Sequence, residues 1–136
     1  MKKFLLDTGI AGHYIAHRPG VFGRAREEVA RGNRVGICVP VLGELWFGVE
    51  GSSTRDRNEQ QLRRALPSLK VWPFDEKAAE EFGCIAAELK RTGRMIGRID
   101  IQIAAIALAM GNATLVSADS DLTAIPGLTV ENWATP

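Results

Sequence analysis

Residues 99–119 read IDIQIAAIALAMGNATLVSAD, and this stretch decides the fold class. From Ile99 to Met110 it is apolar at nearly every position, which is typical of a helix buried on all sides. Gly111 is expected to end that helix, because glycine is common where helices stop. The segment from Ala113 to Ser117 is then predicted as a strand. A buried helix that leads directly into a strand indicates an α/β fold.

The rest of the chain repeats this switch between strand-like and helix-like apolar periods. Strands are expected at residues 3–6, 34–39, 69–72, 113–117 and 128–132. Helices are expected at residues 10–17, 21–31, 40–51, 54–66, 76–92 and 99–110. This alternation predicts a three-layer α/β/α fold, with a mainly parallel sheet of four to five strands covered on both faces. A length of 136 residues suits a single domain, residues 1–136, with one core.

The charge balance excludes one class of nucleic-acid-binding protein. The chain has a net charge of +1, which is not the strongly basic balance of proteins that coat nucleic acid. Positive charge is instead concentrated locally, in the run Lys90, Arg91, Arg94 and Arg98. This run either holds phosphates, with Arg98 as the foremost contact, or is a solvated helix end. A second group is expected to be a solvated face: Arg24, Arg26, Arg31 and Arg34.

The location of the protein is expected to be cytoplasmic. No stretch is long and apolar enough to span a bilayer. Asp7 also places a charge too early for the apolar part of a secretion signal. Cys38 and Cys84 lie far apart in apolar surroundings and have no metal-ligand spacing, so both are expected to be buried, reduced thiols.

Acidic residues fall at informative positions of the predicted elements. Asp7 directly follows the first strand, and Asp119 follows the strand that ends at Ser117. Glu44 lies in the helix that Pro40 begins, and Asp100 opens the buried helix. Ligands of open parallel sheets bind at the carboxyl ends of the strands, so these acids are expected to face one crevice. Each acid alone has a local explanation, such as a turn or a helix cap, and the argument depends on their joint placement.

Several carboxylates in one crevice cannot all stay ionised without a counter-charge. A divalent cation removes this conflict. Oxygen ligands without His or Cys partners favour Mg²⁺ or Mn²⁺. Such an ion lowers the pKa of a bound water and polarises a phosphoryl group, which suits hydrolysis of a phosphodiester bond.

Segments spread over nearly the whole chain carry a resemblance to a known family. They are FLLDT (residues 4–8), VLGEL (41–45), IDIQIAA (99–105), LVSAD (115–119), IPGL (125–128) and ENW (131–133). They resemble the PIN-domain nucleases, especially the VapC-type toxins of bacterial toxin–antitoxin pairs. Gly9 departs from the family pattern, which usually has Asn at this position.

The resemblance implies roles for individual residues. Asp7, Glu44, Asp100 and Asp119 would be the catalytic acids that bind the metal. Ser117 would support the site, and Thr8 would help through its hydroxyl or its backbone. The fourth-acid loop looks one residue short, so Asp121 is the alternative to Asp119.

The resemblance also implies an activity and partners. One PIN-like nuclease domain would cleave RNA with Mg²⁺ or Mn²⁺, leaving a 5′-phosphate and a 3′-hydroxyl. It would form a homodimer and be inhibited by a VapB-like antitoxin, whose extended tail fills the groove.

Two other functions fit parts of the sequence. Asp7-Thr8-Gly9 also matches the Asp-Thr-Gly of aspartic proteases, in which two carboxylates share a proton. Those enzymes are nearly all β, whereas this chain shows strong helical periods, and that interpretation leaves Glu44 and Asp100 without a role. The second alternative is a PIN-like module that binds RNA or protein without cleaving anything.

Overall fold

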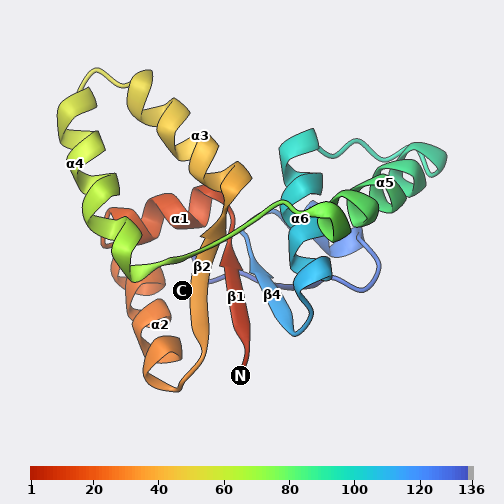
Figure 1. Cartoon of the computed structure of the whole chain (residues 1–136), viewed down its shortest axis with the longest axis horizontal. Helices are drawn as coiled ribbons and strands as arrows, with labels where there is room; N and C mark the ends of the chain where they lie inside the picture. Colours follow the sequence, from red (N-terminus) through yellow and green to blue (C-terminus); the bar gives the residue numbers. More distant parts are fainter. Residues whose placement is uncertain (135–136) are drawn as a thin grey trace.

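A computed structural model, which describes residues 1–134, contains one five-stranded sheet. The strands are β1 (Lys3–Leu6), β2 (Arg34–Cys38), β3 (Lys70–Trp72), β4 (Ala113–Val116) and β5 (Thr129–Glu131). Their order across the sheet is β3-β2-β1-β4-β5, and every neighbouring pair is parallel (Figure 1). The predicted parallel sheet is therefore confirmed.

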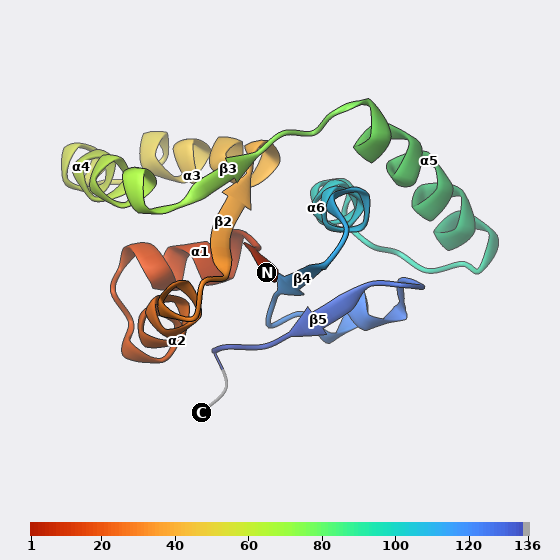
Figure 2. The same cartoon turned by 60° about the horizontal axis from the view of Figure 1, so that its bottom comes forward.

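Helices cover both faces of this sheet. They are α1 (Thr8–Ile15), α2 (Pro19–Ala30), α3 (Val39–Glu50), α4 (Arg55–Ala65), α5 (Glu76–Arg91) and α6 (Arg98–Met110), with short 3₁₀ turns at Leu66–Ser68 and Ser120–Ala124. Figure 2 shows α1 and α2 on one face and α5 and α6 on the other, which confirms the three-layer arrangement. Among residues 1–134, no helix has the length and apolar character needed to cross a membrane.

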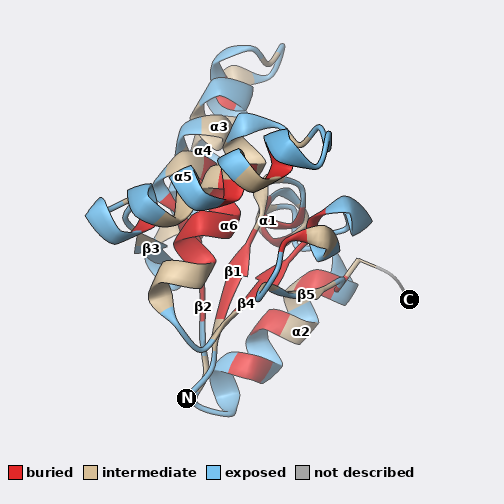
Figure 3. Ribbon diagram, turned by 90° about the vertical axis from the view of Figure 1, so that its right-hand side faces the viewer, coloured by how far each residue is buried: buried red, intermediate tan, exposed pale blue. Residues whose placement is uncertain are grey.

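The core lies between α6 and the central strands. Ala104, Ala105 and Ile106 of α6 are completely buried, as are Leu5 and Leu6 of β1 (Figure 3). This burial explains why residues 99–110 are apolar on every side. Between β2 and β3, a side chain at Gly36 would collide with the backbone of Lys70, so glycine permits this strand pair.

Two expectations from the sequence were wrong in detail. The first helix, expected at residues 10–17, runs from Thr8 to Ile15, and the second, expected from residue 21, begins at Pro19, whose missing N–H leaves no bond unmade in the first turn. Cys38 is buried as predicted, but Cys84 is exposed. Its neighbour Ile85 occupies the buried side of α5, and the helical turn of about 100° per residue directs Cys84 away from it.

The strand order explains where a ligand site can form. From β1 the chain adds β2 and then β3 on one side, and only afterwards places β4 and β5 on the other side of β1. In open parallel sheets, a crevice forms outside the carboxyl ends of the strands where the order reverses. Here that point lies between β1 and β4.

A buried carboxylate fastens α2 to the sheet. Glu28 of α2 is 3% exposed and accepts hydrogen bonds from Asn33, Arg24 and Arg31. Arg24 also contacts Glu131 of β5 at 3.3 Å. Burial alone would raise the pKa of Glu28, but the bonds from Asn33 and Arg24 and the nearby arginine charges lower it below the usual value.

The lowered pKa predicts how Glu28 affects stability. Its ionised form stabilises the fold above the unfolded-state pKa, and this contribution is lost as pH falls through the folded-state pKa. Glu28→Gln should therefore lower the free energy of unfolding at neutral pH. It should also make that free energy fall less steeply as the pH is lowered from about 5 to about 3, as measured by urea unfolding. Glu27→Gln, at an exposed neighbouring position, is the matched control and should preserve the decline. An equally steep decline in Glu28→Gln would contradict this role.

Candidate functional site

Asp7 lies at the point where the strand order reverses. It follows β1, and its Oδ1 accepts a hydrogen bond from the backbone N–H of Ile10 at 2.9 Å, which caps α1. Its own backbone N–H donates to the carbonyl of Val116 at 3.0 Å. This bond joins the carboxyl ends of β1 and β4, so Asp7 stands at the mouth of the crevice.

Thr8 connects α1 to the helix that carries Glu44. The Thr8 hydroxyl donates to Glu44 Oε1 at 2.5 Å. Glu44 lies on α3, which starts at Val39 directly after β2 and has Pro40 in its first turn. The bond therefore turns Glu44 towards the end of β1. The sequence suggested Thr8 as a supporting residue, but nothing in it identified Glu44 as the acceptor.

Asp100 lies in the first turn of α6, where the charges of the other acids act on it. Its pKa is raised, first by burial and then by the charges of Asp119, Asp7 and Glu44. The structure thus brings together carboxylates from β1, α3, α6 and the turn after β4, which are far apart in sequence.

The turn after β4 distinguishes Asp119 from Asp121. Asp119 Oδ1 accepts from the Asp121 backbone N–H at 2.9 Å, and the Asp119 N–H donates to Ser117 Oγ at 3.0 Å. Ser117 is only 2% exposed, so the hydroxyl that accepts this bond lies on the buried side of the turn. Asp119 and Asp121 are both exposed, but only Asp119 is among the charges that raise the pKa of Asp100. Asp119 therefore stays the prediction for the fourth acid, with Asp121 as the alternative.

The free oxygens of these acids are suited to a hard cation. Asp7, Glu44 and Asp119 each have one oxygen held by a protein donor. Within residues 1–134, the second oxygen of each acid and both oxygens of Asp100 have no protein hydrogen bond. As the side chains stand, no three His, Cys, Asp or Glu groups in this range converge closely enough to hold a metal. Binding an ion would require the free oxygens to turn inwards.

Cys38 is not a candidate ligand, although it lies at the start of α3. Burial raises the pKa of its thiol to about 11, and the charge of Glu44 acts in the same direction. The thiol therefore stays protonated at neutral pH, whereas metal ligation requires the thiolate. Oxygen ligands therefore remain the prediction for this site.

A well-formed hollow lies elsewhere. A cavity of about 670 Å³ opens between α1, α2 and α4, with Tyr14, Phe22, Val29 and Ala65 in its wall. None of the acids lines it. We take the group of acids at the carboxyl ends of β1 and β4 as the candidate active site, because the chemistry-bearing groups are there.

Comparisons with known proteins agree with this architecture. The family model described as PIN domain matches residues 4–128. The chain is 34% identical over 131 residues to Ribonuclease VapC2 of Rickettsia felis, covering 96% of this chain and 97% of that protein. It is 32% identical over 134 residues to the tRNA(fMet)-specific endonuclease VapC of Shigella flexneri, covering 98% and 100%.

Solved structures show the same likeness. The crystal structure of VapBC2 from Rickettsia felis bound to a DNA fragment from their promoter contains a chain with a TM-score of 0.89 and 33% identity, covering 96% of this chain and 98% of that chain. DNA-bound VapBC from Salmonella typhimurium gives a TM-score of 0.88 and 31% identity, covering 98% and 99%.

Repulsion from the neighbouring acids predicts how the pKa of Asp100 changes when one of their charges is removed. Asp119→Asn should lower the pKa of Asp100 towards its usual value, because one of the repelling charges is removed. The measurement is the carboxyl-carbon NMR shift of Asp100 against pH, in metal-free protein. Asp121→Asn is the matched control and should leave that pKa unchanged. Equal shifts in the two variants would contradict the placement of Asp119.

Proposed function

This chain belongs to the PIN-domain family, and on that premise we propose that it is a metal-dependent endoribonuclease, the toxin of a toxin–antitoxin pair. One observation carries the proposal. Asp7 follows β1 where the strand order reverses. Its charge and those of Asp119 and Glu44 raise the pKa of Asp100, so carboxylates from distant elements lie within electrostatic reach of one another. The sequence similarity to VapC ribonucleases over nearly the whole chain supports the same activity.

Nucleases of this family generally depend on a divalent metal, and the residues present fit one. Asp7, Glu44, Asp100 and Asp119 offer oxygen ligands with no nitrogen or sulfur partner, which favours Mg²⁺ or Mn²⁺. When bound, such an ion lowers the pKa of a water, polarises the phosphoryl group and neutralises the leaving oxygen. Cleavage then leaves a 5′-phosphate and a 3′-hydroxyl.

The protein's own contribution is to fix the acids before RNA arrives. The α1 cap holds Asp7, the Thr8 hydroxyl holds Glu44, and the backbone turn after Ser117 holds Asp119. In the free site, burial and the charges of the other acids raise the pKa of Asp100 and so favour its neutral form. These bonds hold one oxygen of each of the three acids, so ion binding requires only the free oxygens to turn inwards.

The proposed partners follow from the relatives. The solved relatives are VapBC assemblies, so we assign a VapB-like antitoxin to this chain as well. The apolar hollow between α1, α2 and α4 offers such a partner a surface away from the acids. We further propose a homodimer of single-domain chains, acting on RNA in the cytoplasm.

The fold contradicts the protease interpretation of Asp7-Thr8-Gly9. Aspartic proteases are nearly all β, whereas this sheet is wholly parallel and covered by helices. The second alternative, an inert module that binds RNA or protein, is separated from the nuclease by experiment.

The first test is RNA cleavage by the purified protein with Mg²⁺ or Mn²⁺. Asp7→Asn and Asp100→Asn should each lower the cleavage rate at least about a hundredfold, because a ligand of the ion is removed. EDTA should abolish cleavage, and Asp121→Asn should retain most of it. RNA binding without cleavage by the unaltered chain would instead identify an inert module.

The Thr8 hydroxyl gives a second test. Thr8→Val removes the donor to Glu44, a hydrogen bond to a charged group worth about 1.5–3 kcal/mol, so cleavage should fall about tenfold to a hundredfold. Thr8→Ser keeps the hydroxyl and should restore most of the rate. Thr129→Val, on the exposed side of β5, serves as the matched control. If Thr8→Ser were as impaired as Thr8→Val, the methyl group rather than the hydrogen bond would be responsible.

A further inference from the structure

The arginines of this chain fall into two groups. Some are held by acidic partners within the protein: Arg24, Arg31, Arg55, Arg63 and Arg91. Within residues 1–134 the others form no ion pair and are exposed: Arg18, Arg26, Arg34, Arg57, Arg64, Arg94 and Arg98. Among these, Arg94 and Arg98 are the ones that lie within six residues of Asp100 in sequence. Arg91 lies only three residues before Arg94 and is paired with Glu88. The change from paired to unpaired therefore occurs within one short segment.

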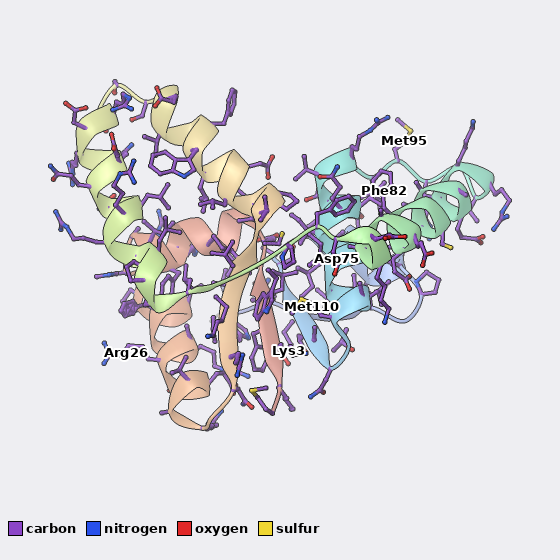
Figure 4. All side chains as sticks on the ribbon, viewed as in Figure 1. Lys3, Arg26, Asp75, Phe82, Met95 and Met110 are labelled. Carbon is purple, nitrogen blue, oxygen red and sulfur yellow. The ribbon has the colours of Figure 1, made fainter. Side chains whose placement is uncertain are left out.

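Arg94 and Arg98 lie on the segment that leads into the candidate active site. Residues 92–97 connect α5 to α6, and Arg98 is the first residue of α6, in the same turn as Asp100. A side chain at Gly97 would bring its Cβ within 3.6 Å of Asp100 Oδ2, so the backbone here lies against the carboxylate. In Figure 4, the labelled Met95 stands at the rim beyond the first turn of α6, away from the sheet.

The absence of pairing is physically informative. The charges of three other carboxylates reach Asp100, and a nearby arginine would normally be drawn to such a group of acids. Arg98 forms no ion pair with any of them in the described part of the chain. Both guanidinium groups therefore remain in water, where they are available to an anionic ligand. The planar guanidinium suits phosphate oxygens, which it can bind through two parallel hydrogen bonds.

We propose that Arg94 and Arg98 bind the backbone phosphates of RNA next to the phosphate that is cleaved. This inference rests on the proposed function. The cleaved phosphate must lie against the acids, so its neighbours along the strand lie beside the residues that flank Asp100. Contacts of this kind position the strand without reading its sequence.

An acidic tail of the antitoxin is a different ligand for the same charges. RNA is favoured because the arginines are continuous in sequence with Asp100, and any cleavable strand must pass this point. The antitoxin has a separate apolar surface available between α1, α2 and α4. The experiment therefore measures both ligands.

The test compares Arg94→Ala and Arg98→Ala with Arg91→Ala, the ion-paired control. Binding of a short RNA is measured in EDTA, so that no cleavage occurs, over a range of salt concentrations. Each unpaired arginine should contribute about 0.7–0.9 to the slope of log K against log salt, so the double variant should lose about 1.5. With metal present, the KM for RNA should rise while kcat stays nearly unchanged, which a folding defect would not produce.

Each outcome decides the inference. An unchanged salt slope in the double variant overturns it, and so does a loss equally large in Arg91→Ala. Loss of antitoxin binding with unaltered RNA binding would assign the arginines to the antitoxin and also overturn it. If the unaltered chain cleaves no RNA, the proposed function fails. RNA binding in EDTA that still depends on Arg94 and Arg98 would in that case support this inference alone.

Discussion

Repulsion between carboxylates at the ends of β1 and β4 is the constraint on which the rest of the structure depends. Asp7, Glu44, Asp100 and Asp119 come from separate elements, and water would screen them better if they stayed apart. Backbone N–H groups hold Asp7 and Asp119, and the Thr8 hydroxyl holds Glu44. Asp100 is placed by its position in the first turn of α6, which packs in the core. The reversal of strand order supplies the crevice, and the parallel sheet directs two of the acids into it.

This arrangement lowers stability where it prepares the site for a cation. The pKa of Asp100 is raised, so its charged form is less favourable in the folded chain than in the unfolded one. Stability contributed by the neutral form is therefore lost as pH rises from the ordinary aspartate value through the raised one. Glu28 shows the opposite case, because its partners favour the charged form. The ionised form of Glu28 therefore stabilises the folded chain, whereas the ionised form of Asp100 destabilises it.

The sequence predicted those features of the fold that follow from the spacing of apolar residues and from the positions of strand ends. The buried helix α6 and the strands around it follow from residues 99–119, and the positions of Asp7 and Asp119 follow from strand ends. Contacts between elements could not be obtained in this way. The Thr8–Glu44 bond joins residues 36 positions apart, and no periodicity encodes it. Cys84 was misjudged because its apolar neighbours pack on the other side of α5. The choice between Asp119 and Asp121 needed the geometry of the turn.

The central proposal is that these acids together bind divalent metal. The most direct measurement is anomalous X-ray diffraction from crystals of the protein soaked in Mn²⁺. The account predicts an anomalous peak at the carboxyl ends of β1 and β4, within coordination distance of oxygens from Asp7 and Asp100, with Glu44 or Asp119 beside them. A crystal in which Mn²⁺ binds only elsewhere, while the acids remain apart, would contradict it.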